Sequence, residues 1–482
     1  MRNSFLILAG DRAKPTEHEI QSDCDCNCAC PDASFKSQFN GLASDALFTT
    51  SPGSISIPLA GGFSVLHSPL STRGAITLNS DAFHRYRRFL DRPQPLTDDF
   101  DREMAEHGLL APVGSMPTLT SGPPQTLTAW LHVTNACNLD CPYCYVRKSS
   151  ARMTETIGEL ALQQLMAEVA RQKFKQLKIK YAGGEASLHY KMVQHLHDRA
   201  TELTLQQEIE LQEVLLTNGV LISAELADWL VESQVKVMVS LDGIGEKNDR
   251  QRPFRDGRPS FSRIEETIDQ VLLPRGIRPD ISVTITRLNA DGIADVMRWI
   301  LARDLPFSLN FYRENMQSRS RTELQLEEQA IIDGMRAAYR VIEEILPTRP
   351  FFNGLLDRVQ GQAHTHTCGV GIGYVVISHE GKLAQCQMHL DHARVNIEDT
   401  ESLLPIVASG PIKNISVEAK EGCRDCSFKY LCTGGCPIET FRATGRWDVQ
   451  SPNCSIYKTL LPEAIRLEGL RILKAAGHWV RT

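Results

Sequence analysis

The stretch "CNLDCPYCY", residues 137–145, decides the fold of this chain. It spaces Cys137, Cys141 and Cys144 as CxxxCxxC and directly follows a strand-like run, "TAWLHVT". A structural zinc site would need a fourth protein ligand, and a disulfide would leave one of these three thiols over. Three cysteines can instead bind three irons of a four-iron cluster and leave the fourth iron open to an exchangeable ligand. The spacing therefore favours an iron-sulfur cluster with one open iron.

Strand-like runs alternate with helical patterns from this stretch onward. The runs are "TAWLHVT", "LKIKYAGG", "EVLLTNG", "VKVMVSLDG", "DISVTITRL" and "FSLNFYR", and helical patterns such as "TETIGELALQQLMAEVARQ" separate them. Strands that alternate with helices predict a parallel sheet, and six units in a row predict an α/β fold of the partial (β/α)6 barrel type over residues 126–346. In such folds the chemistry lies at the carboxyl ends of the strands.

"CNLDCPYCY" resembles the cysteine motif of the radical S-adenosylmethionine (SAM) enzymes, including the aromatic residue before the last cysteine. Short motifs at the next strand ends agree with the resemblance, although each alone is usually a turn or a surface residue. The resemblance implies that the cofactor is bound by Tyr143, Tyr145, Gly183, Gly184, Glu185, Asn218, Ser240 and Arg252. Glu185 would hold the methionine ammonium group, and the two glycines would let the backbone approach the ligand closely.

The same resemblance implies the chemistry of the cysteine stretch. Cys137, Cys141 and Cys144 would be the catalytic and metal-binding residues of a [4Fe-4S] cluster. By analogy with that family, the reduced cluster would cleave SAM to a 5′-deoxyadenosyl radical, which abstracts a hydrogen atom from the substrate. The protein would supply orientation and would exclude water and oxygen.

Residues 350–482 have a second cysteine pattern, whose core is "CRDCSFKYLCTGGC". Two zinc sites are the structural alternative, and they would need a histidine beside the seven cysteines. The pattern resembles the SPASM extension, which carries two auxiliary iron-sulfur clusters in peptide-modifying enzymes. The resemblance assigns Cys423, Cys426, Cys432 and Cys454 to one cluster, and Cys368, Cys386 and Cys436 to the other. We therefore expect three [4Fe-4S] clusters in all.

The second auxiliary cluster is one cysteine short. Its fourth ligand could be a substrate thiolate or water, a residue such as His379, or a cysteine from elsewhere in the chain. A substrate cysteine on that iron would favour thioether formation. The nearby His364, His366 and His389 are interpreted as ordinary surface histidines.

The N-terminal region precedes these two domains. Residues 1–55 are predicted to be a flexible extension that contains Cys24, Cys26, Cys28 and Cys30. This "CDCNCAC" stretch is interpreted as a thiol-rich tail, a soft-metal chelator, a source of the missing ligand or a segment modified in cis. Residues 56–115, with two strand-like and two helical runs, are predicted to be winged-helix-like, loosely resembling leader-peptide recognition domains. A purely structural cap is the alternative.

Charge and composition restrict the partners. The chain has 482 residues, a net charge of −6 and 14 cysteines. This balance gives no basic surface for nucleic acid or an anionic membrane. No run approaches 18 consecutive apolar residues, and the start lacks a secretory signal, so we expect a cytoplasmic protein whose cysteines bind metal.

The leading hypothesis is a maturase of ribosomally synthesised peptides that installs a C–S thioether or C–C crosslink. The chain resembles the His-Xaa-Ser type of peptide maturases and the anaerobic sulfatase maturases, but Gln387 follows Cys386 where the latter have an aspartate base. Epimerisation, cyclopropane formation and formylglycine-type oxidation are enzymatic alternatives, and an iron-sulfur electron carrier or sensor is the non-catalytic one. The expected partners are a precursor peptide and a reductant such as flavodoxin or ferredoxin.

Overall fold

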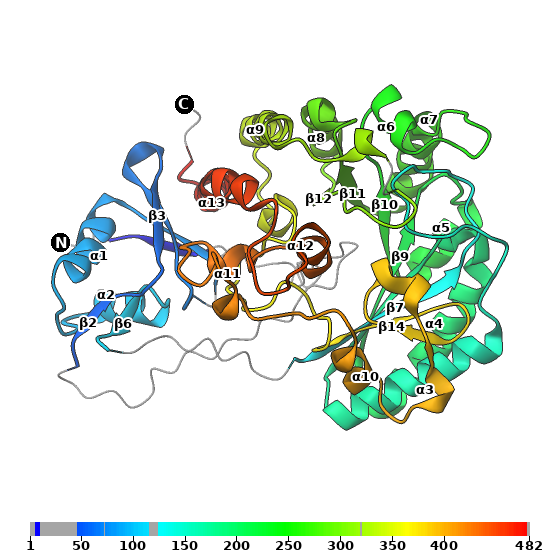
Figure 1. The fold of residues 1–482 in the computed structure, drawn as a ribbon. Helices are drawn as coiled ribbons and strands as arrows, with labels where there is room; N and C mark the ends of the chain where they lie inside the picture. The colour runs from blue at the N-terminus through cyan, green and yellow to red at the C-terminus, as the bar shows by residue number, and fades with distance from the viewer. Residues whose placement is uncertain (1–4, 10–45, 72, 115–123, 319–320, 480–482) are drawn as a thin grey trace.

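A computed structural model describes residues 5–9, 46–71, 73–114, 124–318 and 321–479. In chain order it contains a small N-terminal unit, a barrel of strands and helices, and a cysteine-rich C-terminal region (Figure 1). Cys24, Cys26, Cys28 and Cys30 lie outside the described residues. Within the described part of the chain, no helix is long and apolar enough to cross a membrane.

Six parallel strands form the barrel, as predicted. In sheet order they are β12 (Phe307–Phe311), β11 (Asp280–Ile285), β10 (Lys236–Ser240), β9 (Glu210–Thr217), β8 (Gln176–Gly183) and β7 (Thr126–Thr134). The helices between and after them are α3 (Glu155–Gln172), α4 (Tyr190–Gln207), α5 (Ala224–Glu232), α6 (Glu246–Gln251), α7 (Phe261–Glu266), α8 (Ile293–Ala302) and α9 (Glu328–Ile345). The expectation of a mostly parallel α/β fold is confirmed.

The two faces of the barrel sheet differ in polarity. Successive side chains of a strand point to opposite faces, and the strand register places even-numbered residues beside even-numbered residues. The odd-numbered face meets the helices, because Tyr181 of β8 and His197 of α4 both bond to Glu213 of β9. The even-numbered face therefore lines the inside of the barrel, and it carries polar residues such as His132, Ser240 and Asn310.

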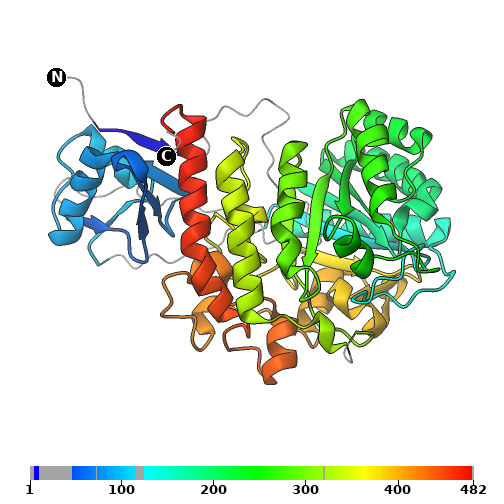
Figure 2. The same ribbon diagram turned by 90° about the horizontal axis from the view of Figure 1, so that it is seen from above.

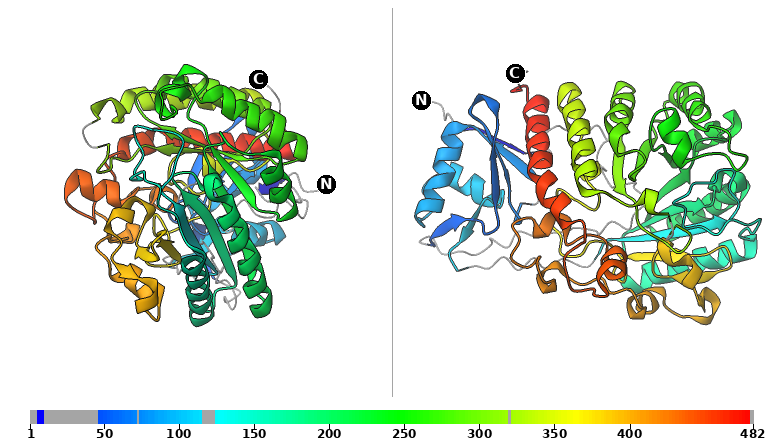
Figure 3. Two further views of the ribbon diagram at one scale, coloured as in Figure 1. Left: turned by 90° about the vertical axis from the view of Figure 1, so that its right-hand side faces the viewer. Right: turned by 45° about the horizontal axis from the view of Figure 1, so that its top comes forward.

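The C-terminal region shares the barrel sheet. β13 (Tyr374–Ile377) pairs in parallel with β7, and β14 (Lys382–Ala384) and β15 (Val395–Asn396) continue the sheet antiparallel. Four helices follow, α10 (Leu403–Ser409), α11 (Lys429–Cys432), α12 (Pro437–Thr444) and α13 (Cys454–Ala475). The two views of Figure 3 show the yellow and orange part of this region, which precedes α13, along one side of the barrel. The boundary predicted at residue 350 thus separates two stretches of chain that build one nine-stranded sheet.

The N-terminal unit begins earlier than predicted. Its antiparallel sheet has the order β1 (Ile7–Ala9), β5 (Ala75–Leu78), β4 (Ser64–His67) and β3 (Ile55–Pro58). A pair, β2 (Phe48–Thr50) and β6 (Leu110–Pro112), and the helices α1 (Ser80–Asp91) and α2 (Asp99–Glu106) complete it. Assigning all of residues 1–55 to a flexible extension was wrong, because β1 and β2 pair with distant strands. The unit also has more sheet than the winged-helix-like prediction of two strands.

Helix α13 joins the N-terminal unit to the rest of the molecule. It packs on the N-terminal sheet so closely that a Cβ on Gly469 would lie 2.6 Å from Val65 Cβ and 2.9 Å from Leu59 Cδ1. Figure 2 shows α13, α9 and α8 in a row that leads from the N-terminal unit to the barrel strands. The three parts of the chain are therefore connected by continuous packing.

Candidate functional site

The three cysteines of the first motif lie in the loop between β7 and α3, at the carboxyl edge of the sheet. All three are partly buried. Burial and the nearby Glu185 carboxylate raise the pKa of Cys137 to about 12, and burial raises the pKa of Cys141 to about 11. Thiolates in such surroundings require a strong positive charge beside them, which a metal centre supplies. This donor set fits an iron-sulfur cluster.

Gly183 and Gly184 serve the cysteine loop directly. The Gly184 amide donates to the Thr134 carbonyl at 2.7 Å, and the Glu185 amide donates to the Ala136 carbonyl at 2.8 Å. A Cβ on Gly183 would lie 2.4 Å from the Thr134 carbonyl oxygen, and one on Gly184 would lie 2.5 Å from that of Ala136. The close approach that these glycines allow is thus to the loop backbone, whereas the sequence had suggested an approach to the ligand.

Glu185 ties the ends of two strands together. Its carboxylate is buried and accepts from Thr217 Oγ1 at 2.7 Å, from the Ser187 amide at 3.0 Å and from the Asn218 amide at 2.6 Å. Asn218 in turn donates through Nδ2 to Asn138 Oδ1 at 2.7 Å, next to Cys137. A carboxylate has about four acceptor positions, so one remains for an ammonium group. The predicted role of Glu185 toward SAM stays a prediction.

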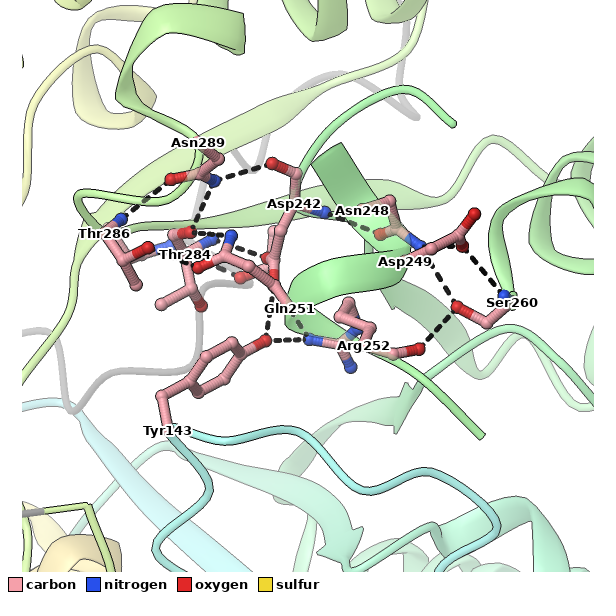
Figure 4. Close-up of polar contacts among 12 residues, drawn as sticks. Tyr143, Asp242, Asn248, Asp249, Gln251, Arg252, Ser260, Thr284, Thr286 and Asn289 are labelled. Atoms are coloured by element: carbon pink, nitrogen blue, oxygen red, sulfur yellow. Dashed lines mark hydrogen bonds and ion pairs between the residues drawn. The ribbon is translucent and has the colours of Figure 1, made fainter. Parts of the chain in front are cut away.

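Tyr143, Asp242 and Arg252 converge in one buried network (Figure 4). The Tyr143 hydroxyl donates to Asp242 Oδ2 at 2.5 Å, and Arg252 Nη1 donates to the Tyr143 hydroxyl and lies 3.4 Å from Asp242 Oδ2. The other oxygen of Asp242 accepts from the Thr284 amide at 2.8 Å. Asp242 is only 1% exposed, and Arg252 is 7% exposed. The network therefore fixes the position of the Arg252 guanidinium.

Asp242 is a site residue that sequence reasoning missed. It belongs to the "SLDG" run, from which only Ser240 was selected. Ser240 ends β10 on the face that lines the barrel. An aspartate two residues after a buried strand and ten residues before Arg252 is the signal in the sequence that could indicate it.

Several buried polar atoms around these residues have no hydrogen-bond partner among the described residues. They include Asn138 Nδ2, Ser187 Oγ and Arg252 Nε, which flank the cysteine loop, the "GGE" turn and the Asp242 network. An unpartnered buried polar atom is unfavourable, so a cluster of them indicates the place of a polar ligand. SAM, with its ammonium, carboxylate and ribose groups, fits this donor set.

Tyr145 links the cysteine loop to the C-terminal region. Burial, together with the nearby Cys144 and Cys386 sulfurs, raises the pKa of Tyr145 well above its usual value. Its side chain therefore lies within electrostatic range of one cysteine from each region.

Four of the C-terminal cysteines line one cavity. The cavity has a volume of about 330 Å³ including space open to solvent, and it is lined by Cys423, Cys426, Cys432 and Cys454, among others. Burial raises the pKa of Cys432 to about 12 and that of Cys423 to about 11. The structure thus brings together the four residues that the sequence assigned to one auxiliary cluster, and no disulfide joins the ten described cysteines.

The other three cysteines also lie near one another. The electrostatic neighbours of Cys386 include Cys436, Cys368 and Arg358, and burial raises its pKa to about 12. The charged neighbours of His379 are Glu380 and Lys382, and its ring lies 6.0 Å from that of His132. The structure gives no contact that would support His379 as the fourth ligand. His364 is buried, which corrects its interpretation as a surface residue.

Among the described residues, neither cysteine group is arranged as a binding site for a single metal ion. Among the residues that the structure describes, no three His, Cys, Asp or Glu side chains are placed to hold one metal ion. A cubane cluster separates its ligand sulfurs more widely than a single ion does.

Gln387 occupies the position beside Cys386 as a neutral amide. Its Oε1 accepts from the Tyr374 hydroxyl at 2.8 Å and from the Cys386 thiol at 3.3 Å, and the residue is buried. An amide in this place cannot accept a proton as a carboxylate would.

Comparisons with known proteins agree with this geometry. Residues 131–300 match the family model "Radical SAM superfamily". An uncharacterized protein of Methanocaldococcus jannaschii is 29% identical over 178 residues, which are 36% of this chain and 57% of that protein. The cysteine-type anaerobic sulfatase-maturating enzyme of Clostridium perfringens strain 13 is 23% identical over 330 residues, which are 63% of this chain and 86% of that enzyme.

Among solved structures, native anSMEcpe with bound AdoMet and Cp18Cys peptide has a TM-score of 0.58 and 20% identity, covering 71% of this chain and 99% of that one. This likeness concerns the fold. The matched model spans the barrel strands from β7 to β11 with the cysteine loop, the "GGE" turn and Arg252. Residues 131–300 therefore form a radical SAM domain, which implies a [4Fe-4S] cluster and SAM as cofactors of the enzyme.

Proposed function

We propose that the chain is a peptide maturase that installs a C–S thioether or C–C crosslink in a ribosomally synthesised precursor peptide. The observation that carries this proposal is the approach of two cysteine groups to one side chain, that of Tyr145. Tyr145 follows Cys144 of the cysteine loop. It is also within electrostatic range of Cys386, which belongs to the C-terminal group of three cysteines. A substrate bound between the two cysteine groups would lose a hydrogen atom on the side of the cysteine loop. On the other side it would have an electron acceptor at the C-terminal cysteines. Crosslinking needs both functions.

The chain's own residues prepare this site. Cys137, Cys141 and Cys144 would hold the cluster, and Glu185, Asn218, Ser240 and Arg252 would orient SAM, with Tyr143 and Asp242 fixing Arg252. When bound, the cluster and SAM supply a 5′-deoxyadenosyl radical that abstracts hydrogen from a substrate carbon. The burial of these polar groups excludes water from the site.

Two auxiliary [4Fe-4S] clusters are part of the proposal. Cys423, Cys426, Cys432 and Cys454 line a common cavity and would ligate one of them completely. Cys368, Cys386 and Cys436 would leave an open iron in the other, where a substrate thiolate could bind. A cytoplasmic flavodoxin or ferredoxin would supply the electrons.

The N-terminal unit supports a peptide as the substrate. β3 is the last strand of its sheet and pairs only with β4 among the described strands. Its residues are partly or fully exposed. An edge strand of this kind can accept an extended peptide through main-chain hydrogen bonds.

Formylglycine-type oxidation is the second candidate, because the chain is similar to a sulfatase-maturating enzyme. The buried Gln387 beside Cys386 speaks against it, since the amide cannot act as a base. Epimerisation remains an alternative outcome of the same hydrogen abstraction. An electron carrier or sensor would not need the residues that we assign to SAM.

Two measurements test the proposal. The full chain, reconstituted with iron and sulfide without oxygen, should form 5′-deoxyadenosine from SAM and dithionite, and a Cys137→Ala variant should not. Co-expression with short peptides encoded beside its gene should then yield a peptide that has lost two hydrogen atoms per crosslink, detected by mass spectrometry. Formation of 5′-deoxyadenosine with a product of unchanged mass would favour epimerisation. Formylglycine would appear as the replacement of a cysteine sulfur by oxygen with the loss of two hydrogen atoms, or as a serine that has lost two hydrogen atoms and carries an aldehyde that reacts with a hydrazide.

A further inference from the structure

Lys420 is a buried lysine that adjoins both groups of C-terminal cysteines. The residue is 1% exposed, and its Nζ donates to the Thr433 carbonyl at 2.8 Å. Among the described residues, this nitrogen forms no ion pair with a carboxylate. Burying an ammonium group is unfavourable unless an opposite charge lies near it. Lys420 therefore needs another source of negative charge close by.

The ammonium group borders the cavity of the first auxiliary site. A Cβ placed on Gly434 would lie 3.2 Å from Lys420 Nζ and 3.1 Å from Cys423 Sγ, so the nitrogen and this sulfur flank the same point. Gly434 lines the cavity together with Cys423 and Cys432. The backbone supports the approach, because the Cys423 amide donates to the Lys420 carbonyl at 3.1 Å. Lys420 is therefore held beside the cysteines of this site.

The same nitrogen is connected to the second auxiliary site. The Thr433 carbonyl that accepts from Lys420 also accepts from Thr367 Oγ1 at 3.0 Å, and the two threonine hydroxyls are 3.1 Å apart. Thr367 directly precedes Cys368 of the second site. Thr433 directly follows Cys432 of the first. One carbonyl oxygen thus joins the lysine to a loop from each cysteine group.

Cysteine sulfurs are the main charges that act on Lys420. Burial lowers the pKa of Lys420, and the influences that raise it most are the sulfurs of Cys423, Cys368, Cys432 and Cys436. Two of these sulfurs belong to each of the expected clusters. Sulfurs that bind iron are thiolates, so the loaded clusters would supply the negative charge that a buried ammonium group needs.

The place of Lys420 favours the reduced form of both clusters. Reduction adds one negative charge to an iron-sulfur cluster, and a nearby positive charge stabilises it. In the proposed thioether reaction, a substrate carbon radical joins a thiolate. The new C–S bond leaves one electron, which the cluster at Cys368 would accept. Because one charge acts on both clusters, it raises their two reduction potentials together.

We propose that the ammonium group of Lys420 raises the reduction potentials of the two auxiliary clusters and so prepares them to accept the electron released during crosslinking. This inference rests on the proposed function, because it takes both clusters to be present. Lys420 acts through the clusters, so it is a positioning residue and not a catalytic one. A purely structural lysine would affect iron content or stability and would leave the potentials unchanged.

The test measures the reduction potentials of the full chain, reconstituted without oxygen. Titration with dithionite, followed by electron paramagnetic resonance, gives the midpoint of each cluster signal. Added SAM identifies the radical cluster, because it changes the signal of the cluster that binds it. Lys420→Met removes the charge, Lys420→Gln also keeps a donor, and Lys420→Arg keeps the charge. Lys458→Met is the matched control, because Lys458 is exposed and lines the same cavity.

Lys420→Met and Lys420→Gln should keep about twelve iron atoms per chain, the content of three four-iron clusters, and should lower the potentials of the signals that SAM does not change. At a fixed potential, the ratio of reduced to oxidised cluster should fall about tenfold or more, as one unit charge at an effective dielectric constant of about 20 predicts. Tenfold corresponds to about 59 mV for one electron. Lys420→Arg should stay near the wild type. Lys458→Met should shift the potentials less, because water and salt screen its charge.

Unchanged potentials in Lys420→Met and Lys420→Gln, or a shift of the same size in Lys458→Met, would overturn the inference. Loss of about eight iron atoms from all three Lys420 variants would also overturn it, because the residue would then hold the ligand loops instead of tuning the clusters. If Lys420→Met alone loses iron, the potentials of Lys420→Gln decide. A wild-type chain that binds only about four iron atoms would instead contradict the auxiliary clusters of the proposed function.

Discussion

Replacing Asp242 by Asn tests whether the buried network positions Arg252 for SAM. The substitution keeps the shape of the side chain and removes its charge, so Arg252 loses a carboxylate that lies 3.4 Å from its Nη1. At that distance and an effective dielectric constant of about 20, the attraction is about 5 kcal/mol. Desolvation offsets part of it, and removing one partner of a buried ion pair costs about 3–5 kcal/mol in practice. The guanidinium of the variant should therefore leave its present position.

The expected result is weaker SAM binding at unchanged iron content. One oriented, charge-assisted hydrogen bond contributes about 1.5–3 kcal/mol, so the dissociation constant should rise about 10- to 100-fold. Equilibrium dialysis of SAM against the reconstituted chain, without oxygen, measures it. Tyr143→Phe keeps the 3.4 Å ion pair and should cost less, about 3- to 10-fold.

Asp256→Asn is the control, because it removes an equal charge from an exposed residue four positions after Arg252. Wild-type SAM affinity in Asp242→Asn, with full iron, would refute the positioning role. Loss of iron together with affinity would mean that Asp242 acts on the cysteine loop through Tyr143.

Three further predictions follow from the packing. Gly184→Ala should lower the iron content by about four atoms per chain, because its Cβ would collide with the Ala136 carbonyl. Gly158→Ala is the control and should keep the full iron content, because its Cβ would contact only the side chains of Leu196 and Met192. Cys454→Ser should also remove about one four-iron cluster, measured by iron analysis, while uncoupled 5′-deoxyadenosine formation persists. Burial and the adjacent His364 lower the pKa of His67 in the folded protein to about 4, from an ordinary value of 6.5. As the pH falls below 6.5, His67 is therefore protonated in the unfolded chain before it is protonated in the folded protein. This should reduce the free energy of unfolding by about 2 kcal/mol between pH 7.5 and 5, and His67→Leu should show a correspondingly smaller fall in its thermal midpoint.

Local patterns in the sequence were sufficient to predict the barrel and its cysteine loop. Each of the six strands is a short apolar run, and the helices between them have their own periodicity, so neighbouring residues carry the information. The two cysteine sets of the C-terminal region were separable by spacing, and four of them do line one cavity.

Long-range contacts account for what the sequence did not reveal. Strand β1 is three residues long and forms only because β5, some seventy residues away, offers it an edge. β13 joins the barrel sheet through β7 across more than two hundred residues. The burial of His364 and the role of Asp242 depend on segments that meet only in the folded chain, and no local pattern marks such meetings.

The cysteine loop and the residues proposed to bind SAM form one connected unit. Asn218 contacts the Glu185 carboxylate through its amide and Asn138 through its side chain. On the other side of the loop, the amide of Asp140 donates to the Pro253 carbonyl at 2.8 Å, directly after Arg252. Because each strand end that would contact SAM also contacts the loop, ordering the loop around a cluster also orders the SAM contacts. The cluster and SAM should therefore bind cooperatively, each stabilising contacts that the other requires.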